Sequence, residues 1–80
     1  MDEIRKLLIK MQKADRDRLR AIIAYLEAGQ TAGLDVKKLK NSKLYRVRIG
    51  RYRIFFCYNE ERAINVVTIR LRSEDSYRDI

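Results

Sequence analysis

The stretch from residue 44 to residue 58 constrains the fold more than any other part of this 80-residue chain. Apolar and polar side chains alternate with period two on both sides of Gly50-Arg51, as in two strands with one buried face. The connection has only two residues, and glycine supplies the positive φ that a type II′ hairpin turn requires. The stretch therefore predicts a β-hairpin in which Ile49 lies opposite Tyr52.

This register gives the hairpin one apolar face and one basic face. The apolar face carries Tyr45, Val47, Ile49, Tyr52, Ile54 and Phe56. On the other face Arg48 lies opposite Arg53, and Arg46 lies opposite Phe55. Like charges directly across a ladder destabilise it, which favours a site that binds an anion. The alternative is a solvated outer surface over which the arginine stems lie flat, and the residues alone leave both interpretations open.

Two helical segments precede the hairpin. Residues 2–12 form the first, and Asp15 is the expected N-cap of a second that runs to about Ala28, with Gly29 as its left-handed C-terminal residue. The link between them is short, so the two helices are expected to be antiparallel neighbours. Their apolar stripes are Ile4, Leu7, Leu8 and Met11, followed by Leu19, Ile22, Ile23 and Leu26.

Residues 63–72 predict a third strand after a turn at residues 59–62. If Tyr58 pairs with Ala63, Val67 meets Ile54 and Ile69 meets Tyr52 on the apolar face, while Thr68 lies beside Arg53. Arg70 and Arg72 then join the basic face. The chain is thus expected to form one α+β domain over residues 1–80, in which an N-terminal helical hairpin packs on a three-stranded antiparallel meander.

Residues 30–43 carry no sustained period, and Leu34, Val36 and Leu39 are expected at the edge of the core. Lysines are dense here. Lys40 and Lys43 lead into the arginine face and extend a track for a phosphate backbone, with Arg51 and Arg70 as further RNA-binding candidates. The alternative is a flexible basic loop, which the pattern favours slightly more for Lys37 and Lys38 than for Lys40 and Lys43.

Composition narrows the function classes. A formal charge of +8 and a pI near 10.0 favour a polyanionic partner. The chain has no histidine and one cysteine, Cys57, so no metal site, disulfide framework or cofactor is expected. No apolar run reaches membrane-spanning length and no secretory signal is evident, which favours a cytoplasmic protein.

The hairpin resembles the central hairpin of the RelE/ParE toxin superfamily. The matching residues are Tyr45, Arg46, Arg48, Gly50, Tyr52, Arg53 and Ile54, and the resemblance extends through residues 33–40 and to an arginine before the near-terminal Tyr77-Arg78. Members usually begin with a strand before the first helix. Here Met1 opens almost directly into the helix, so either the chain is truncated or that strand is missing, and an uncovered sheet edge would then favour self-association.

The resemblance is nearer to RelE and implies a toxin of a type II toxin–antitoxin system, an endoribonuclease that cuts messenger RNA in the ribosomal A site. In that scheme the ribose 2′-OH attacks its own phosphate. The resemblance places Arg53 and Arg72 at the scissile phosphate, Arg46 and Arg48 on the backbone, and Tyr77 in base stacking or proton transfer. It also implies a cognate antitoxin, the ribosome and messenger RNA as partners.

Three alternatives remain open at this point. The chain could be a ParE-like toxin that inhibits DNA gyrase by binding it. It could bind nucleic acid without catalysis, in which case affinity would fall smoothly as each arginine is removed and as salt rises. It could also be a degenerate, non-toxic homologue, an interpretation prompted by the missing strand.

Overall fold

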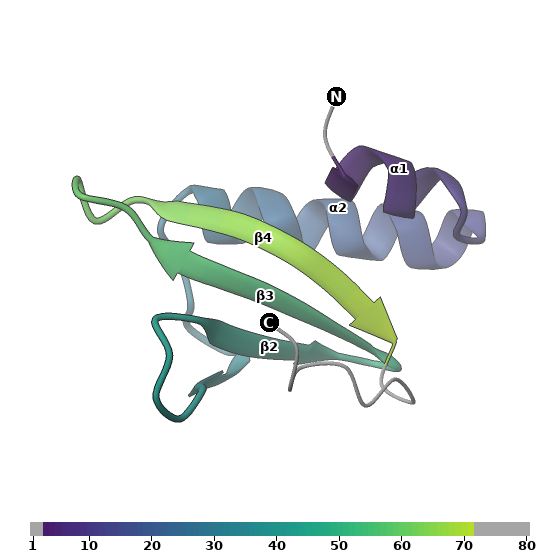
Figure 1. Cartoon of the computed structure of the whole chain (residues 1–80). Coiled ribbons are helices and arrows are strands. Elements are labelled where there is room, and N and C mark those ends of the chain that lie inside the picture. The colour runs from purple at the N-terminus through teal and green to yellow at the C-terminus, as the bar shows by residue number, and fades with distance from the viewer. Residues whose placement is uncertain (1–2, 72–80) are drawn as a thin grey trace.

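The computed structural model describes residues 3–71, and these form two helices on one face of an antiparallel sheet (Figure 1). The predicted α+β class is confirmed. The helices are α1 (Glu3–Ile9) and α2 (Lys13–Glu27), and they run in opposite directions in Figure 1. The four strands lie in the order β1-β2-β3-β4 and have the bounds β1 Asp35–Lys38, β2 Tyr45–Ile49, β3 Tyr52–Tyr58 and β4 Ile64–Leu71.

Both helices bury the stripes expected of them, but α2 begins earlier than predicted. Its N-cap is Gln12, so the prediction of Asp15 as N-cap is wrong and Asp15 lies in the first helical turn. The C-terminal end is as predicted, because Gly29 has φ +84°. The amide of Gly29 donates to Leu26 O at 2.8 Å and that of Gln30 to Tyr25 O at 3.1 Å. This pair of bonds is a Schellman motif, which satisfies carbonyls that the helix end leaves open.

The predicted hairpin register is confirmed at every position. Ile49 pairs with Tyr52 and Arg48 with Arg53. Gly50 has φ +57°, whereas Arg51 has no positive φ, and this combination fits a type II′ turn.

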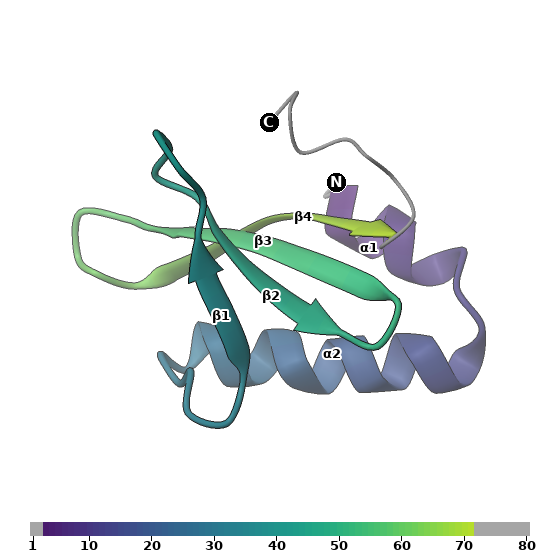
Figure 2. The ribbon, with the colours of Figure 1, turned by 90° about the horizontal axis from the view of Figure 1, so that it is seen from below.

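The prediction of three strands is wrong, because β1 adds a fourth at the edge of the sheet beside β2 (Figure 2). Residues 35–38 alternate only around Val36, which is half-buried, and that pattern is too short to mark a strand by itself. In the register, Asp35 pairs with Arg48 and Lys37 with Arg46. An acidic and a basic side chain therefore join the arginine face.

The predicted register of the last strand is also wrong. The loop after β3 is one residue longer than expected, since Asn59 N donates to Ala63 O and Tyr58 pairs with Ile64. A bulge between Phe55 and Phe56 then adds a second one-residue shift, which leaves Val67 40% exposed. Two shifts restore the alternation, so the residues after the bulge keep their predicted faces even though each has a different partner.

The helices cover the apolar face of the sheet. In Figure 2 α2 runs along the length of the sheet, with α1 at the end of β4. The buried cluster joins both layers and contains Leu8, Leu19, Ile23, Leu26, Val47, Ile49, Ile54, Phe56, Ile64 and Ile69. Within residues 3–71, neither helix is long and apolar enough to cross a membrane. The arginine face lies on the other side of the sheet from these helices.

Candidate nucleic-acid interface

Three arginines form a row across three neighbouring strands. Arg48 on β2 pairs with Arg53 on β3, and Arg53 pairs with Arg70 on β4. The bonded strands of a sheet lie about 4.8 Å apart, so like charges are held close together in this row. The side chain of Arg48 is 52% exposed, and Arg53 and Arg70 are half-buried. The Nε atom of Arg70 is buried and has no hydrogen-bond partner among the described residues.

The neighbouring positions on the same face are much less exposed. Arg46 pairs with Phe55, and Phe55 pairs with Thr68. These residues are 6%, 1% and 5% exposed. The interpretation of a fully solvated outer surface is therefore wrong for this part of the face. The guanidinium of Arg46 is held in a low-exposure position, where its hydrogen bonds matter more than they would in water.

One carboxylate, that of Asp35, lies between two of the arginines. Its Oδ1 is 3.9 Å from Arg46 Nη2 and its Oδ2 is 3.9 Å from Arg48 Nε. Both separations exceed hydrogen-bond length. Asp35 neutralises charge at the end of the arginine row without binding either guanidinium tightly, and its side chain is 58% exposed.

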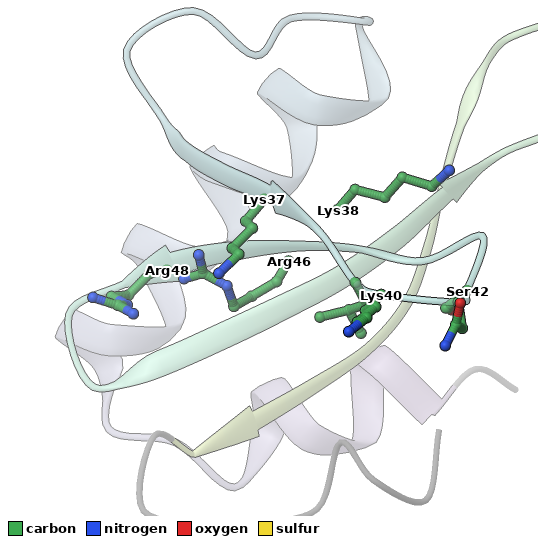
Figure 3. Close-up of a pocket in the computed structure, with 8 residues that line it drawn as sticks. Lys37, Lys38, Lys40, Ser42, Arg46 and Arg48 are labelled. Carbon is green, nitrogen blue, oxygen red and sulfur yellow. The ribbon is translucent and has the colours of Figure 1, made fainter.

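A groove of about 880 Å³ opens beside these residues, between β1, β2 and the loop that joins them (Figure 3). Leu39 N donates to Leu44 O at 2.9 Å and Leu44 N donates to Ser42 Oγ at 3.0 Å, and these bonds shape the loop. Every charged residue of the lining is basic. The lining consists of Lys37, Lys38, Leu39, Lys40, Asn41, Ser42, Arg46 and Arg48.

The predicted site residues are only partly brought together. Arg46, Arg48, Arg53 and Arg70 share one face, and Lys40 lines the groove beside it. Two others are exposed but stand apart from the groove lining: Lys43 in the β1–β2 loop and Arg51 in the hairpin turn. Arg72 and Tyr77, the tyrosine that the resemblance assigns to stacking or proton transfer, lie outside the described residues.

Sequence reasoning missed two contributors, Asp35 and Lys37. Both reach the site through β1, which the sequence pattern did not predict. The turn-forming residues around this strand were the available signal, since Gly33 and Asn41 both have positive φ and bracket it.

This arrangement is suited to holding phosphate groups. Guanidinium groups offer paired donors that match phosphate oxygens, and lysines add point charge. Within residues 3–71 no group of three or more histidine, cysteine or acidic residues could hold a metal ion. The chemistry of the described site is therefore positive charge and hydrogen-bond donation.

The fold and its basic sheet face define a small α+β domain of the RelE-like class. The structure is similar to a chain in the crystal structure of the RelB-RelE antitoxin-toxin complex from Methanococcus jannaschii, with a TM-score of 0.72 and 27% sequence identity. The match covers 90% of this chain and 87% of that chain. No curated protein sequence matches.

The family model for the ParE toxin of the type II toxin–antitoxin system parDE matches residues 2–76. The chain therefore belongs to the ParE toxin family, within the RelE/ParE superfamily. The predicted superfamily is confirmed, and the protein is a toxin of a type II toxin–antitoxin system.

Proposed function

We propose that this toxin is a RelE-like endoribonuclease that cuts messenger RNA on the ribosome. The observation that carries the proposal is the row of Arg48, Arg53 and Arg70 across three strands of one face. Like charges held this close favour the binding of an anion between them. A phosphodiester becomes more negative as its own 2′-OH attacks it, and donors arranged beforehand stabilise that change.

The chemistry proposed is an internal transesterification. The 2′-hydroxyl gives up its proton as its oxygen bonds to phosphorus. The bond to the 5′-oxygen breaks and that oxygen takes up a proton, so the products are a 2′,3′-cyclic phosphate and a 5′-hydroxyl. Arg53 and Arg70 face each other across β3 and β4 and would grip the non-bridging oxygens. Arg72 and Tyr77 keep the roles implied by the resemblance, at the phosphate and in stacking or proton transfer. Arginine stays protonated, so none of these guanidiniums serves as the base.

A cognate antitoxin is part of this proposal. The structurally similar chain comes from a RelB-RelE antitoxin-toxin complex. A partner of this toxin would neutralise it by covering the arginine face with acidic side chains, which complementary charge favours.

The test compares wild type with Arg53→Ala on translating ribosomes and maps the ends of the messages. Removal of one charge-stabilising donor is expected to slow cleavage by about 10²–10³-fold. Arg20→Ala, a change at an exposed residue of α2, is the matched control and should cut like wild type. Uncut messages at confirmed expression of the wild type would reject the nuclease.

A second candidate function is gyrase inhibition, and the match to the ParE family model favours it. It is a binding function, so no residue has to act on a phosphodiester. The same expression strains distinguish the two. Inhibition of gyrase would relax plasmid DNA and leave message ends unchanged, whereas a nuclease would cut messages and leave supercoiling as in cells without the toxin.

A further inference from the structure

The groove between β1 and β2 holds an unbalanced set of charges. Along β1 and β2 two pairs stand side by side, with Asp35 opposite Arg48 and Lys37 opposite Arg46. Asp35 borders the groove without belonging to its lining. Three cations therefore share one carboxylate, and Lys40 adds a further positive charge from the loop. In Figure 3 Lys37, Arg46 and Arg48 gather on the same side of the two strands, while Lys38 points away from them.

Arg46 is the residue in this set with unmet hydrogen bonding. Its side chain is 7% exposed, and its Nη1 atom is buried without a hydrogen-bond partner among residues 3–71. The nearest carboxylate oxygen stands 3.9 Å from Nη2, which is too far for a hydrogen bond. A buried donor without an acceptor is destabilising, and a phosphate oxygen entering the groove would supply one.

We propose that this groove binds a backbone phosphate of single-stranded RNA, next to the phosphate held by the arginine row, and that Asp35 is its internal counter-ion. The carboxylate screens Arg46 and Arg48 while the groove is empty and gives way when a phosphate arrives. Its half-exposed side chain and its long contacts leave it free to do so. This inference rests on the proposed function, because it takes RNA as the ligand.

RNA fits better than an acidic protein because the groove is continuous with the arginine row. Arg48 belongs to both, since it lines the groove and pairs with Arg53. β1 lies two strand spacings from β3, roughly 10 Å, so one nucleic-acid strand crossing the sheet meets both sets of cations. An evenly spaced chain of phosphates satisfies this geometry without any specific side chain from a partner.

The experiment measures binding of a 2′-O-methyl single-stranded RNA, which cannot undergo transesterification, by fluorescence anisotropy at several salt concentrations. Asp35→Asn is expected to tighten binding by about 3–10-fold at low salt, because a competing carboxylate charge is lost. The matched control is Asp17→Asn. Asp17 forms an ion pair with Lys13 at 2.9 Å, so Asp17→Asn also removes a carboxylate from a basic partner and changes the net charge by the same amount as Asp35→Asn. Asp17 lies on α2, away from the groove. That control should leave the affinity unchanged.

Lys37→Gln and Lys40→Gln test the groove independently of Asp35. Each is expected to weaken binding and to make the slope of log K against log salt shallower by about 0.7. These two side chains are exposed, so the substitutions leave the core intact. Thermal unfolding of every variant checks that the fold is kept. If Asp35→Asn does not fold, the two lysine variants still test whether the groove binds RNA.

Three results would overturn the inference. The first is an affinity of Asp35→Asn equal to that of Asp17→Asn. The second is an Asp35→Asn variant that binds polyglutamate more tightly than wild type does but binds the RNA no more tightly, which would assign the groove to an acidic protein. The third is loss of message cleavage in Asp35→Asn at unchanged RNA affinity, which would place Asp35 in the reaction. Because the RNA cannot be cleaved, tighter binding by Asp35→Asn supports the groove even where wild type leaves messages uncut and the nuclease proposal fails.

Discussion

The hydroxyl of Tyr52 donates a hydrogen bond of 3.3 Å to Oδ2 of Asp15. The two residues are 37 positions apart in the chain and join the first turn of α2 to the start of β3. Tyr52 also packs against the core cluster with its ring. The bond therefore fixes the helical layer against the end of the sheet where the hairpin turn brings Arg48 and Arg53 together.

Tyr52→Phe keeps the ring and removes only this hydrogen bond. We expect the free energy of unfolding at pH 7 to fall by about 1 kcal/mol, because a hydrogen bond to a charged acceptor is lost and its long donor–acceptor distance limits its strength. Urea denaturation measures the change. Tyr25→Phe is the matched control in a second tyrosine, whose hydroxyl donates to Ala32 O at 2.9 Å without a charged acceptor. A larger loss in Tyr25→Phe than in Tyr52→Phe would contradict this account.

The Tyr52–Asp15 bond also predicts a dependence on alkaline pH. Burial, and after it the charge and hydrogen bond of Asp15, raise the pKa of Tyr52 above its usual value of 10.0. The folded state then holds the phenol proton more tightly than the unfolded state, so stability falls as pH rises from 10 through the raised pKa. Below pH 10 the contribution is fully present. The difference in unfolding free energy between wild type and Tyr52→Phe should therefore stay constant below pH 10 and shrink as the pH rises above it, and a constant difference throughout would contradict the prediction.

Gly50 lies in the hairpin turn, where even the addition of one methyl group should lower the free energy of unfolding. It has φ +57°, and a Cβ built there would lie 3.2 Å from Arg18 Nη1. We expect Gly50→Ala to lose about 1–2 kcal/mol of unfolding free energy, chiefly from the left-handed backbone. Gly29→Ala is the control for the backbone term alone, since at φ +84° nothing lies within 4 Å of the added atom. Chemical denaturation compares them.

The double variant Arg18→Ala Gly50→Ala separates the two causes. Arg18 contributes the flexible end of a side chain, so its removal should restore only a few tenths of a kcal/mol. Recovery of the whole loss would show that crowding by Arg18, and not the backbone conformation of the turn, sets the requirement for glycine.

The sequence predicted the part of the site that depends on a short connection. Two residues at Gly50-Arg51 leave one register, and this register alone places Arg48 beside Arg53. The last strand follows a longer loop and contains a bulge, and neither changes the alternation of residues in a way that the sequence reveals. Arg70 nevertheless lies on the predicted face, because two one-residue shifts together leave the alternation of faces unchanged. Its partner differs from the prediction: Arg70 lies beside Arg53, where Thr68 was expected.

The counter-ion and the groove were not predictable in the same way. Asp35 meets Arg46 and Arg48 only because residues 35–38 pair with β2 as an edge strand. A four-residue strand with one half-buried side chain, Val36, has almost no periodic signal, and it is pairing in the folded sheet that stabilises it. Edge strands of this kind become visible only once the central hairpin is in place.

The arginine face is also expected to bind an anion in the absence of nucleic acid. If the face binds anions, inorganic phosphate should stabilise the folded protein, because ligands that bind only the native state raise its stability. At a phosphate concentration ten times the dissociation constant the gain is about 1.4 kcal/mol, which corresponds to a rise of roughly 6–11 °C in the melting temperature of a domain of this size. Differential scanning fluorimetry in phosphate and in chloride at equal ionic strength measures it.

Arg48→Gln should lose most of this gain, since Arg48 belongs to both the row and the groove. Phosphate also stabilises proteins in general by exclusion from their surfaces, so the comparison needs a variant with the same change in charge elsewhere. Arg20→Gln, at an exposed position on α2, provides it and should keep the full shift. Equal shifts in the two variants would mean that phosphate acts through general exclusion, and the arginines of this face would then have no specific affinity for the group that both proposals require them to bind.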